Sequence, residues 1–206
     1  PAKALGFATA CVFLMTWLLH SYQWFWLRGG FPPAFLSDND EDSRQWRLDF
    51  VRTFLERDLP QLGVQIPSEV LRRFWTMVAH YHGQIWNGAE LARALALSEK
   101  TVRAYLDLLT GAFVLRQLPP WFENLGKRQV KAPKVYVRDT GILHQLLGLR
   151  TGQELVGHPK CGASWEGYAI EETLKLLQPD EAYFWATHNG AELDLLLFTR
   201  GRRFGV

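Results

Sequence analysis

Apolar residues recur at helical spacing in the first half of the chain. Within residues 43–59, Trp46, Phe50 and Phe54 fall on one side of a helix, and charged residues fall on the other side. Pro60 is expected to end this helix, because proline has no backbone N–H to donate and its ring clashes with the preceding turn. The pattern therefore predicts an amphipathic helix that buries one face.

A second helix and a pair of short helices are predicted after it. Residues 67–82 place apolar side chains three and four positions apart. Asn87 and Ser98 are residue types that cap helix N-termini, and each precedes a short helical segment, residues 88–95 and residues 101–109. Two short helices joined by a tight turn indicate a helix-turn-helix.

The pattern then changes to strands. Residues 112–118 alternate like a strand, and residues 134–137 form a second apolar run after a proline-containing loop. Helix, helix-turn-helix and a two-stranded hairpin, in that order, predict a winged helix over residues 67–140.

The C-terminal third combines helix and strand. A short helix is expected over residues 139–147, and Ser164 or a neighbour is expected to cap a helix over residues 165–177. Strands are expected over residues 182–185 and 191–198, with a third beginning after a turn at Arg200. The predicted fold class is α+β, with a mainly helical N-terminal part, a winged helix and a truncated α/β half-domain.

The N-terminal segment has no charge between Lys3 and Arg28. Its apolar run approaches the length of about 20 residues that spans a bilayer, so residues 4–27 could anchor the chain in a membrane, or could form a buried helix. Glycines and prolines over residues 28–33 break any helix and indicate a boundary. Two cysteines give no disulfide framework, so a cytoplasmic location is the simpler expectation.

The net charge of +2 is too small to indicate nucleic-acid binding by itself, so this prediction depends on local clusters. Basic side chains gather on the second helix of the helix-turn-helix and in the loop between the two strands, where a winged helix contacts phosphates. The predicted nucleic-acid-binding residues are Lys100, Arg103, Arg116, Lys127, Arg128, Lys131 and Lys134. The alternative is a module that binds a protein partner or only packs against its neighbours.

Three acidic residues could form a catalytic site. Glu192 and Asp194 lie two apart on one strand and so share a face, and a helix packed on the sheet could bring Glu166 to them. Clustered carboxylates of this kind bind Mg²⁺ for phosphodiester hydrolysis, with Glu166 and Asp194 as the expected ligands. The alternative is an inactive sheet in which Glu166 caps its helix and Glu192 is solvated.

Other candidate chemistry is weaker. Five dispersed histidines favour structural roles over a metal site; they are His80, His82, His144, His158 and His188. The chain contains no Gly-x-x-x-x-Gly-Lys-Ser/Thr loop, so it is not expected to bind and hydrolyse ATP unaided.

Several short motifs, taken in order, resemble the C-terminal half of prokaryotic AAA-type ATPases. In that family an ATPase core precedes a winged helix and a domain of unknown function that is similar to PD-(D/E)XK nucleases. The resemblance covers about residues 26–206. It rests on Trp26-Leu27-Arg28-Gly29-Gly30-Phe31-Pro32, Phe54-Leu55-Glu56-Arg57-Asp58-Leu59, the winged helix, Trp165-Glu166-Gly167-Tyr168 and Gly190-Ala191-Glu192-Leu193-Asp194.

The resemblance implies a division of the chain and a parent activity. The implied parts are an apolar segment (1–27), an ATPase lid-like helical linker (28–66), the winged helix (67–140) and a truncated nuclease-like domain (141–206). Arg28 would sense nucleotide if an ATP-binding core were present, and Glu166, Glu192 and Asp194 match the family's acidic positions. Two departures, the missing core and the missing Glu-x-Lys strand, imply a fragment without catalytic activity of its own.

Overall fold

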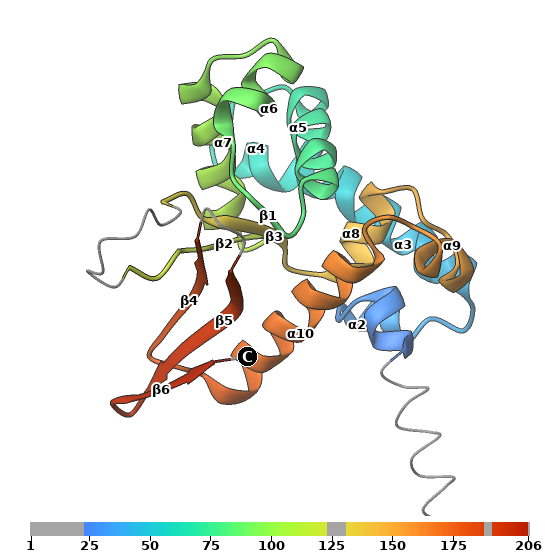
Figure 1. Cartoon of the computed structure of the whole chain (residues 1–206). Helices are drawn as coiled ribbons and strands as arrows, with labels where there is room; N and C mark the ends of the chain where they lie inside the picture. The colour runs from blue at the N-terminus through green and yellow to red at the C-terminus, as the bar shows by residue number, and fades with distance from the viewer. Residues whose placement is uncertain (1–22, 123–130, 188–190, 206) are drawn as a thin grey trace, which may run out of the picture.

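A computed structural model describes residues 23–122, 131–187 and 191–205. Residues 23–28 are helical and lead into a helical region (Figure 1). The named helices are α2 (Pro32–Phe35), α3 (Asp40–Thr53), the π-helical turn η1 (Phe54–Asp58), α4 (Leu59–Gln61), α5 (Ser68–His80), α6 (Gly88–Leu95), α7 (Glu99–Gly111), α8 (Thr140–Leu146), α9 (Gly152–Val156) and α10 (Cys161–Leu177).

Two small antiparallel sheets complete the α+β fold. One has the strand order β1 (Gln84–Ile85), β3 (Lys134–Val137), β2 (Leu115–Leu118), and the other has the order β4 (Glu181–Ala186), β5 (Glu192–Thr199), β6 (Arg202–Gly205). The order α5, β1, α6, α7, β2, β3 is that of a winged helix. The helix-turn-helix and the hairpin thus fold as predicted. Strand β1 was not predicted, because it is too short to show an alternating pattern.

Local capping chemistry explains where the winged-helix helices begin. The Asn87 side chain accepts the backbone N–H of Glu90, and the Ser98 hydroxyl accepts that of Thr101, as expected for N-caps. Before β2, Phe113 has a positive φ of 61°, so the predicted strand at residues 112–118 begins only at Leu115.

Pro60 does not end the first long helix, contrary to the prediction. The helix starts at Asp40, capped by Asn39, and continues through Pro60 to Gln61. In the π-helical turn, the N–H of Leu59 donates to the carbonyl of Phe54, five residues earlier. The wider turn accommodates a residue that has no N–H to give, so the helix tolerates proline here.

The expected cap of α10 is also wrong. The helix begins at Cys161, four residues before the predicted start, and Ser164 lies buried inside its first turn. The Ser164 hydroxyl accepts a hydrogen bond from the Trp26 indole at 3.0 Å and contacts His144 Nε2 at 2.7 Å. Ser164 therefore joins α10 to other parts of the chain instead of capping it.

The winged-helix sheet is covered on both faces. Figure 1 shows α5, α6 and α7 on one side of β1–β3–β2, and α10 with β4–β6 on the other side. On the second side, Leu118 and Tyr136 pack with Ile170, Phe184 and Leu195 in a core that the two sheets share. The strands that form a wing in this fold are therefore part of an interior interface.

The larger core spans the helical region and the winged helix. It includes Val51 and Leu55 from the first helical segment, Trp75 from α5, and Ile142 and Leu143 from α8. The division at residues 66/67 and 140/141 stays a prediction. No helix in the described part of the chain combines the length and the apolar character that a membrane span needs, and residues 4–22 of the proposed anchor lie outside that part.

Candidate functional site

The three predicted acidic residues meet where β3, β5 and α10 come together. Glu166 projects from α10, and Glu192 and Asp194 project from β5. All three form ion pairs with one ammonium group, that of Lys134 on β3. Its Nζ lies 3.1 Å from both Glu166 Oε1 and Asp194 Oδ1. The predicted convergence of the carboxylates is thus present, around a lysine from the winged helix.

The electrostatics of this cluster stabilise the ammonium. Burial by itself would lower the pKa of Lys134, whose side chain is 5% exposed, but the carboxylates of Glu192, Glu166 and Asp194 outweigh it and raise that pKa. The Tyr136 hydroxyl also donates to Glu166 Oε1 at 2.5 Å, and burial together with that carboxylate raises the pKa of Tyr136. The cluster is a satisfied polar network at an interface.

These residues do not fit a resident Mg²⁺. The described part of the chain contains no group of three or more His, Cys, Asp or Glu side chains that could hold a metal ion. The ammonium of Lys134 occupies the position between the carboxylates that a cation would need, and it already neutralises them.

Two residues predicted to contact phosphates, Lys134 and Arg116, are paired with carboxylates in this structure. Lys134 is 4% exposed. Arg116 on β2 pairs with Glu171 of α10, which is 2% exposed and also accepts a bond from Arg138 Nε at 3.2 Å. Because the sheet packs against α10 and β5, both cations lie beside carboxylates of those elements, and phosphate binding would compete with these ion pairs.

The other predicted basic residues remain at the surface or outside the described part. Lys100 and Arg103 are exposed on α7, and Arg103 pairs with Asp107 one turn further on. Lys131 is exposed before β3. Lys127 and Arg128 lie outside the described residues.

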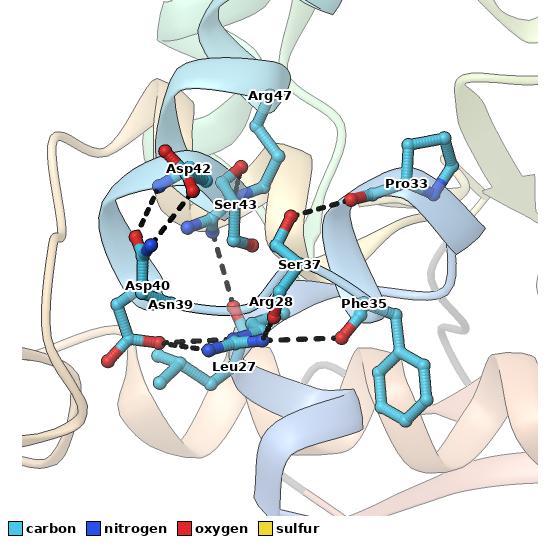
Figure 2. A network of polar contacts seen from close by, with 10 residues as sticks. All are labelled: Leu27, Arg28, Pro33, Phe35, Ser37, Asn39, Asp40, Asp42, Ser43 and Arg47. Atoms are coloured by element: carbon cyan, nitrogen blue, oxygen red, sulfur yellow. Dashed lines mark hydrogen bonds and ion pairs between the residues drawn. The ribbon is translucent and has the colours of Figure 1, made fainter.

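Arg28, which the resemblance implies would sense nucleotide, is buried and hydrogen-bonded within residues 35–40. It is 7% exposed, and its guanidinium donates to Asp40 from Nε at 3.0 Å and from Nη2 at 2.9 Å. Its Nη1 donates to the carbonyls of Ser37 (2.7 Å) and Phe35 (3.3 Å), as Figure 2 shows. These bonds close the loop around α2 onto the start of α3, and they would have to break before Arg28 could contact a nucleotide.

A second buried arginine was not predicted. Arg47 on α3 is 3% exposed and donates to the carbonyls of Ser43, Leu27 and Gly141. Burial lowers its pKa, and the charge of Asp139 opposes that effect. The apolar positions around residue 47 indicated an amphipathic helix, but nothing local showed that one of its charged residues would point inward.

Two of the five histidines have the structural role that the dispersed pattern favoured. His82 and His144 are fully buried. His82 Nδ1 accepts the N–H of Val137, and its Nε2 lies 3.1 Å from the carbonyl of Ala163 on α10. Burial lowers the pKa of His82 to about 3 and that of His144 to about 4, so both rings are neutral at neutral pH.

The chain belongs to the family described as a domain of unknown function (DUF8612), which matches residues 19–153. A second family of unknown function, DUF4143, matches residues 161–206.

Two curated mycobacterial proteins are similar to this chain. They are the uncharacterized protein Mb2031c of Mycobacterium bovis and the uncharacterized protein Rv2008c of Mycobacterium tuberculosis, each 56% identical over 180 residues, or 87% of this chain. The chain spans 41% of the length of either relative. The solved structure of the transcriptional regulator PA3341 matches 65% of this chain and 94% of its own at 18% identity, with a TM-score of 0.28.

Proposed function

We propose that this chain is the non-catalytic binding part of a longer protein, and that its winged helix binds DNA through the face formed by α6 and α7. One observation carries the proposal: α10 and β4–β5 cover the far face of the winged-helix sheet, so the helix-turn-helix remains the accessible side of the unit. In a winged helix, the second helix of that motif is the one that enters the major groove.

The charges on this face favour a modest affinity. The face exposes three basic residues, Arg93, Lys100 and Arg103. It also exposes three acidic residues, Glu90, Glu99 and Asp107. Because the balance is even, the strong non-specific attraction of a basic surface is absent, and binding depends on particular contacts by Lys100 and Arg103. Lys127, Arg128 and Lys131 in the loop between β2 and β3 are the proposed additional phosphate contacts.

We also propose that the longer protein is an ATPase of the AAA type. The motifs that carry the resemblance support this, and the greater length of the mycobacterial relatives is sufficient for a further region. ATP binding then belongs to a region outside this chain, since residues 1–206 contain no phosphate-binding loop. The nuclease-like alternative is not proposed, because Lys134 takes the place of a metal among the carboxylates.

Fluorescence anisotropy with a labelled DNA duplex tests the DNA proposal. Affinity is expected to fall as salt rises from 50 to 200 mM, and to fall at least tenfold in a Lys100→Ala/Arg103→Ala double variant, since each good contact contributes about 1–3 kcal/mol. The control is Arg52→Ala, because Arg52 is exposed on α3 and pairs with Asp49 much as Arg103 pairs with Asp107. Salt-independent binding, or equal affinity of the double variant, would overturn the proposal.

The even charge balance favours a protein partner as the second candidate. A protein surface that meets α6 and α7 needs no excess of positive charge. If the chain fails to bind DNA, but binds the remaining part of the M. tuberculosis relative added as a separate polypeptide, and the Lys100→Ala/Arg103→Ala variant weakens that complex, the second candidate replaces the first.

A further inference from the structure

The hairpin formed by β5 and β6 carries an arginine at a position that disfavours it. Its two-residue turn consists of Arg200 and Gly201, with positive φ angles of 48° and 72°. Such a turn favours asparagine, aspartate or glycine at its first position, because most other side chains are strained at positive φ. Thr199 and Arg202 pair directly across the turn, and Figure 1 shows the hairpin at an end of the molecule away from α6 and α7. Residues that are held in a strained conformation are frequent in binding sites.

The side chains of Arg200 and Arg202 have unused hydrogen-bond donors. Both residues are exposed, and neither guanidinium forms a hydrogen bond or an ion pair with another residue in the described part of the chain. The acids at this end of the sheet are Asp180, which accepts the backbone N–H of Arg200 at 2.9 Å, and Glu181, which accepts the Tyr183 hydroxyl at 3.0 Å. Because a guanidinium presents several N–H groups in a plane, it matches the oxygens of a phosphate. The hairpin therefore offers two cations to an anionic ligand.

Beside the hairpin, the sheet face that points away from α10 is aromatic. Leu197 of β5 belongs to the same core as Ile170 of α10, so the next residue, Phe198, points to the opposite face. Trp121 packs there, with its ring centroid 4.6 Å from that of Phe198 and 5.1 Å from that of Tyr183. All three rings are partly exposed.

The strand register joins the arginines to the aromatic face. Arg203 of β6 lies directly opposite Phe198, and side chains opposite each other in antiparallel strands share a face. Arginines therefore border the aromatic face along its β6 edge. Cations beside partly exposed rings are the features of sites for single-stranded nucleic acid, in which the backbone contacts the cations and unstacked bases contact the rings. A duplex keeps its bases stacked and cannot use the rings in this way.

We propose that this face binds single-stranded nucleic acid, with Arg200 and Arg202 on phosphates and with bases against the rings of Trp121 and Phe198. The site is separate from the α6–α7 face, for which duplex DNA is proposed, so either proposal can fail without the other.

Fluorescence anisotropy with two labelled single strands tests the proposal. One is a strand of about twelve thymidines, which is within the usual site size, and the other is an abasic strand of the same length, which has the same phosphates without bases. The full chain is expected to bind the thymidine strand at least fivefold more tightly, because bases that stack on aromatic rings add affinity. An Arg200→Asn/Arg202→Gln variant is expected to bind the thymidine strand at least tenfold more weakly. Asparagine tolerates a positive φ, so this variant keeps the turn.

Two control variants separate the hairpin from other basic residues. Arg52→Gln/Arg73→Gln removes two exposed arginines, from α3 and α5, and is expected to keep full affinity. Lys100→Ala/Arg103→Ala alters the α6–α7 face and is also expected to keep full affinity for the thymidine strand. In the hairpin variant, the slope of log affinity against log salt is expected to become shallower by about 1.4, since each phosphate contact to a single strand contributes about 0.7.

Phe198→Leu tests the aromatic contact. The variant is expected to bind the thymidine strand at least threefold more weakly and the abasic strand as the wild type does, and a thermal unfolding transition confirms that it is folded. If Phe198→Leu does not fold, the comparison of the two strands on the wild-type chain tests the same contact. No binding, equal affinity for the two strands, or full affinity of the hairpin variant would overturn the proposal. Absence of binding, together with a complex with the remaining part of the M. tuberculosis relative that the hairpin variant weakens, would assign this face to a protein partner instead.

Discussion

Lys134 lies among the carboxylates of Glu166, Glu192 and Asp194, and its removal would leave three negative charges without their cation. Lys134→Met keeps the length of the side chain and removes the charge. The free energy of unfolding is expected to fall by about 2 kcal/mol, less than for a fully buried pair because Glu192 and Asp194 are more than a third exposed. Urea denaturation at neutral pH measures this change.

The same variant tests the assignment of Lys134 as the cation of this carboxylate cluster. In Lys134→Met, millimolar Mg²⁺ is expected to restore part of the lost stability, because the carboxylates then lack a counter-ion. Wild-type chain and the exposed control Lys131→Met are expected not to respond. Equal stabilisation of the wild type by Mg²⁺ would contradict the assignment of Lys134 as the resident cation.

At the scale of residues, the sequence predicted which acids converge, but it did not predict that they surround a lysine. The two-residue spacing of Glu192 and Asp194 places them on one face of a strand whatever the tertiary structure. Lys134 comes from a strand far away in the chain, and a lysine beside a basic loop looks the same in the sequence whether it faces phosphates or carboxylates. Only the packing of β3 against α10 distinguishes the two.

Elements are positioned against one another by close backbone contacts, most clearly at the start of α8. A Cβ on Gly141 would lie 2.0 Å from the carbonyl oxygen of Arg28, which is part of a backbone that cannot easily move. Gly141→Ala is therefore expected to lower the free energy of unfolding by more than 2 kcal/mol, or to prevent folding. Thermal and urea unfolding measure it.

A matched glycine provides the control for that prediction. Gly162 lies in the first turn of α10, and a Cβ there would meet nothing within 4 Å. Gly162→Ala is expected to stabilise the chain by about 0.5–1 kcal/mol, because alanine has the higher helix propensity. If the two alanine variants were equally stable, the close approach of α8 to the Arg28 loop would not hold.

The elements that the sequence predicted well are those with local signals. Asn87 and Ser98 cap their helices with their own side chains, so the helix-turn-helix was visible without tertiary information. The predictions for Pro60 and Ser164 were wrong, because a rare backbone feature and non-local contacts decide the roles of these residues. A π-helical turn accommodates the proline, and contacts with Trp26 and His144 bury the serine.

At the scale of the whole molecule, two neutral histidines join the N-terminal and winged-helix parts to α10. His82 bridges Val137 and Ala163, and His144 bridges Leu27 and Ser164. A Cβ on Gly167 would lie 2.4 Å from His82 Nε2, so α10 approaches this ring as closely as glycine allows. Protonation of either ring would place a charge in a buried site.

The pH dependence of stability follows from these rings. Both pKa values are lower in the folded chain, about 3 for His82 and about 4 for His144, than the value near 6.5 of an unfolded histidine. The folded state therefore binds fewer protons, so the stabilisation is complete above about pH 6.5 and is lost as the pH falls toward 4 and 3. At pH 5 the loss amounts to about 2 kcal/mol for each ring. Asp139 acts in the opposite direction, because burial raises its pKa.

Urea denaturation between pH 7.5 and pH 5 measures this loss, and variants assign it. His82→Asn keeps an acceptor for the N–H of Val137 but does not titrate. The variant is expected to be less stable than the wild type at neutral pH. Because it lacks one of the two titrating rings, its free energy of unfolding is expected to decline toward pH 5 about half as steeply as that of the wild type. His80→Gln, at an exposed position on α5, is expected to retain the full decline. A decline of the same steepness in His82→Asn and His80→Gln would show that other groups govern the acid response, because removing a buried titrating ring must change the number of protons taken up on unfolding.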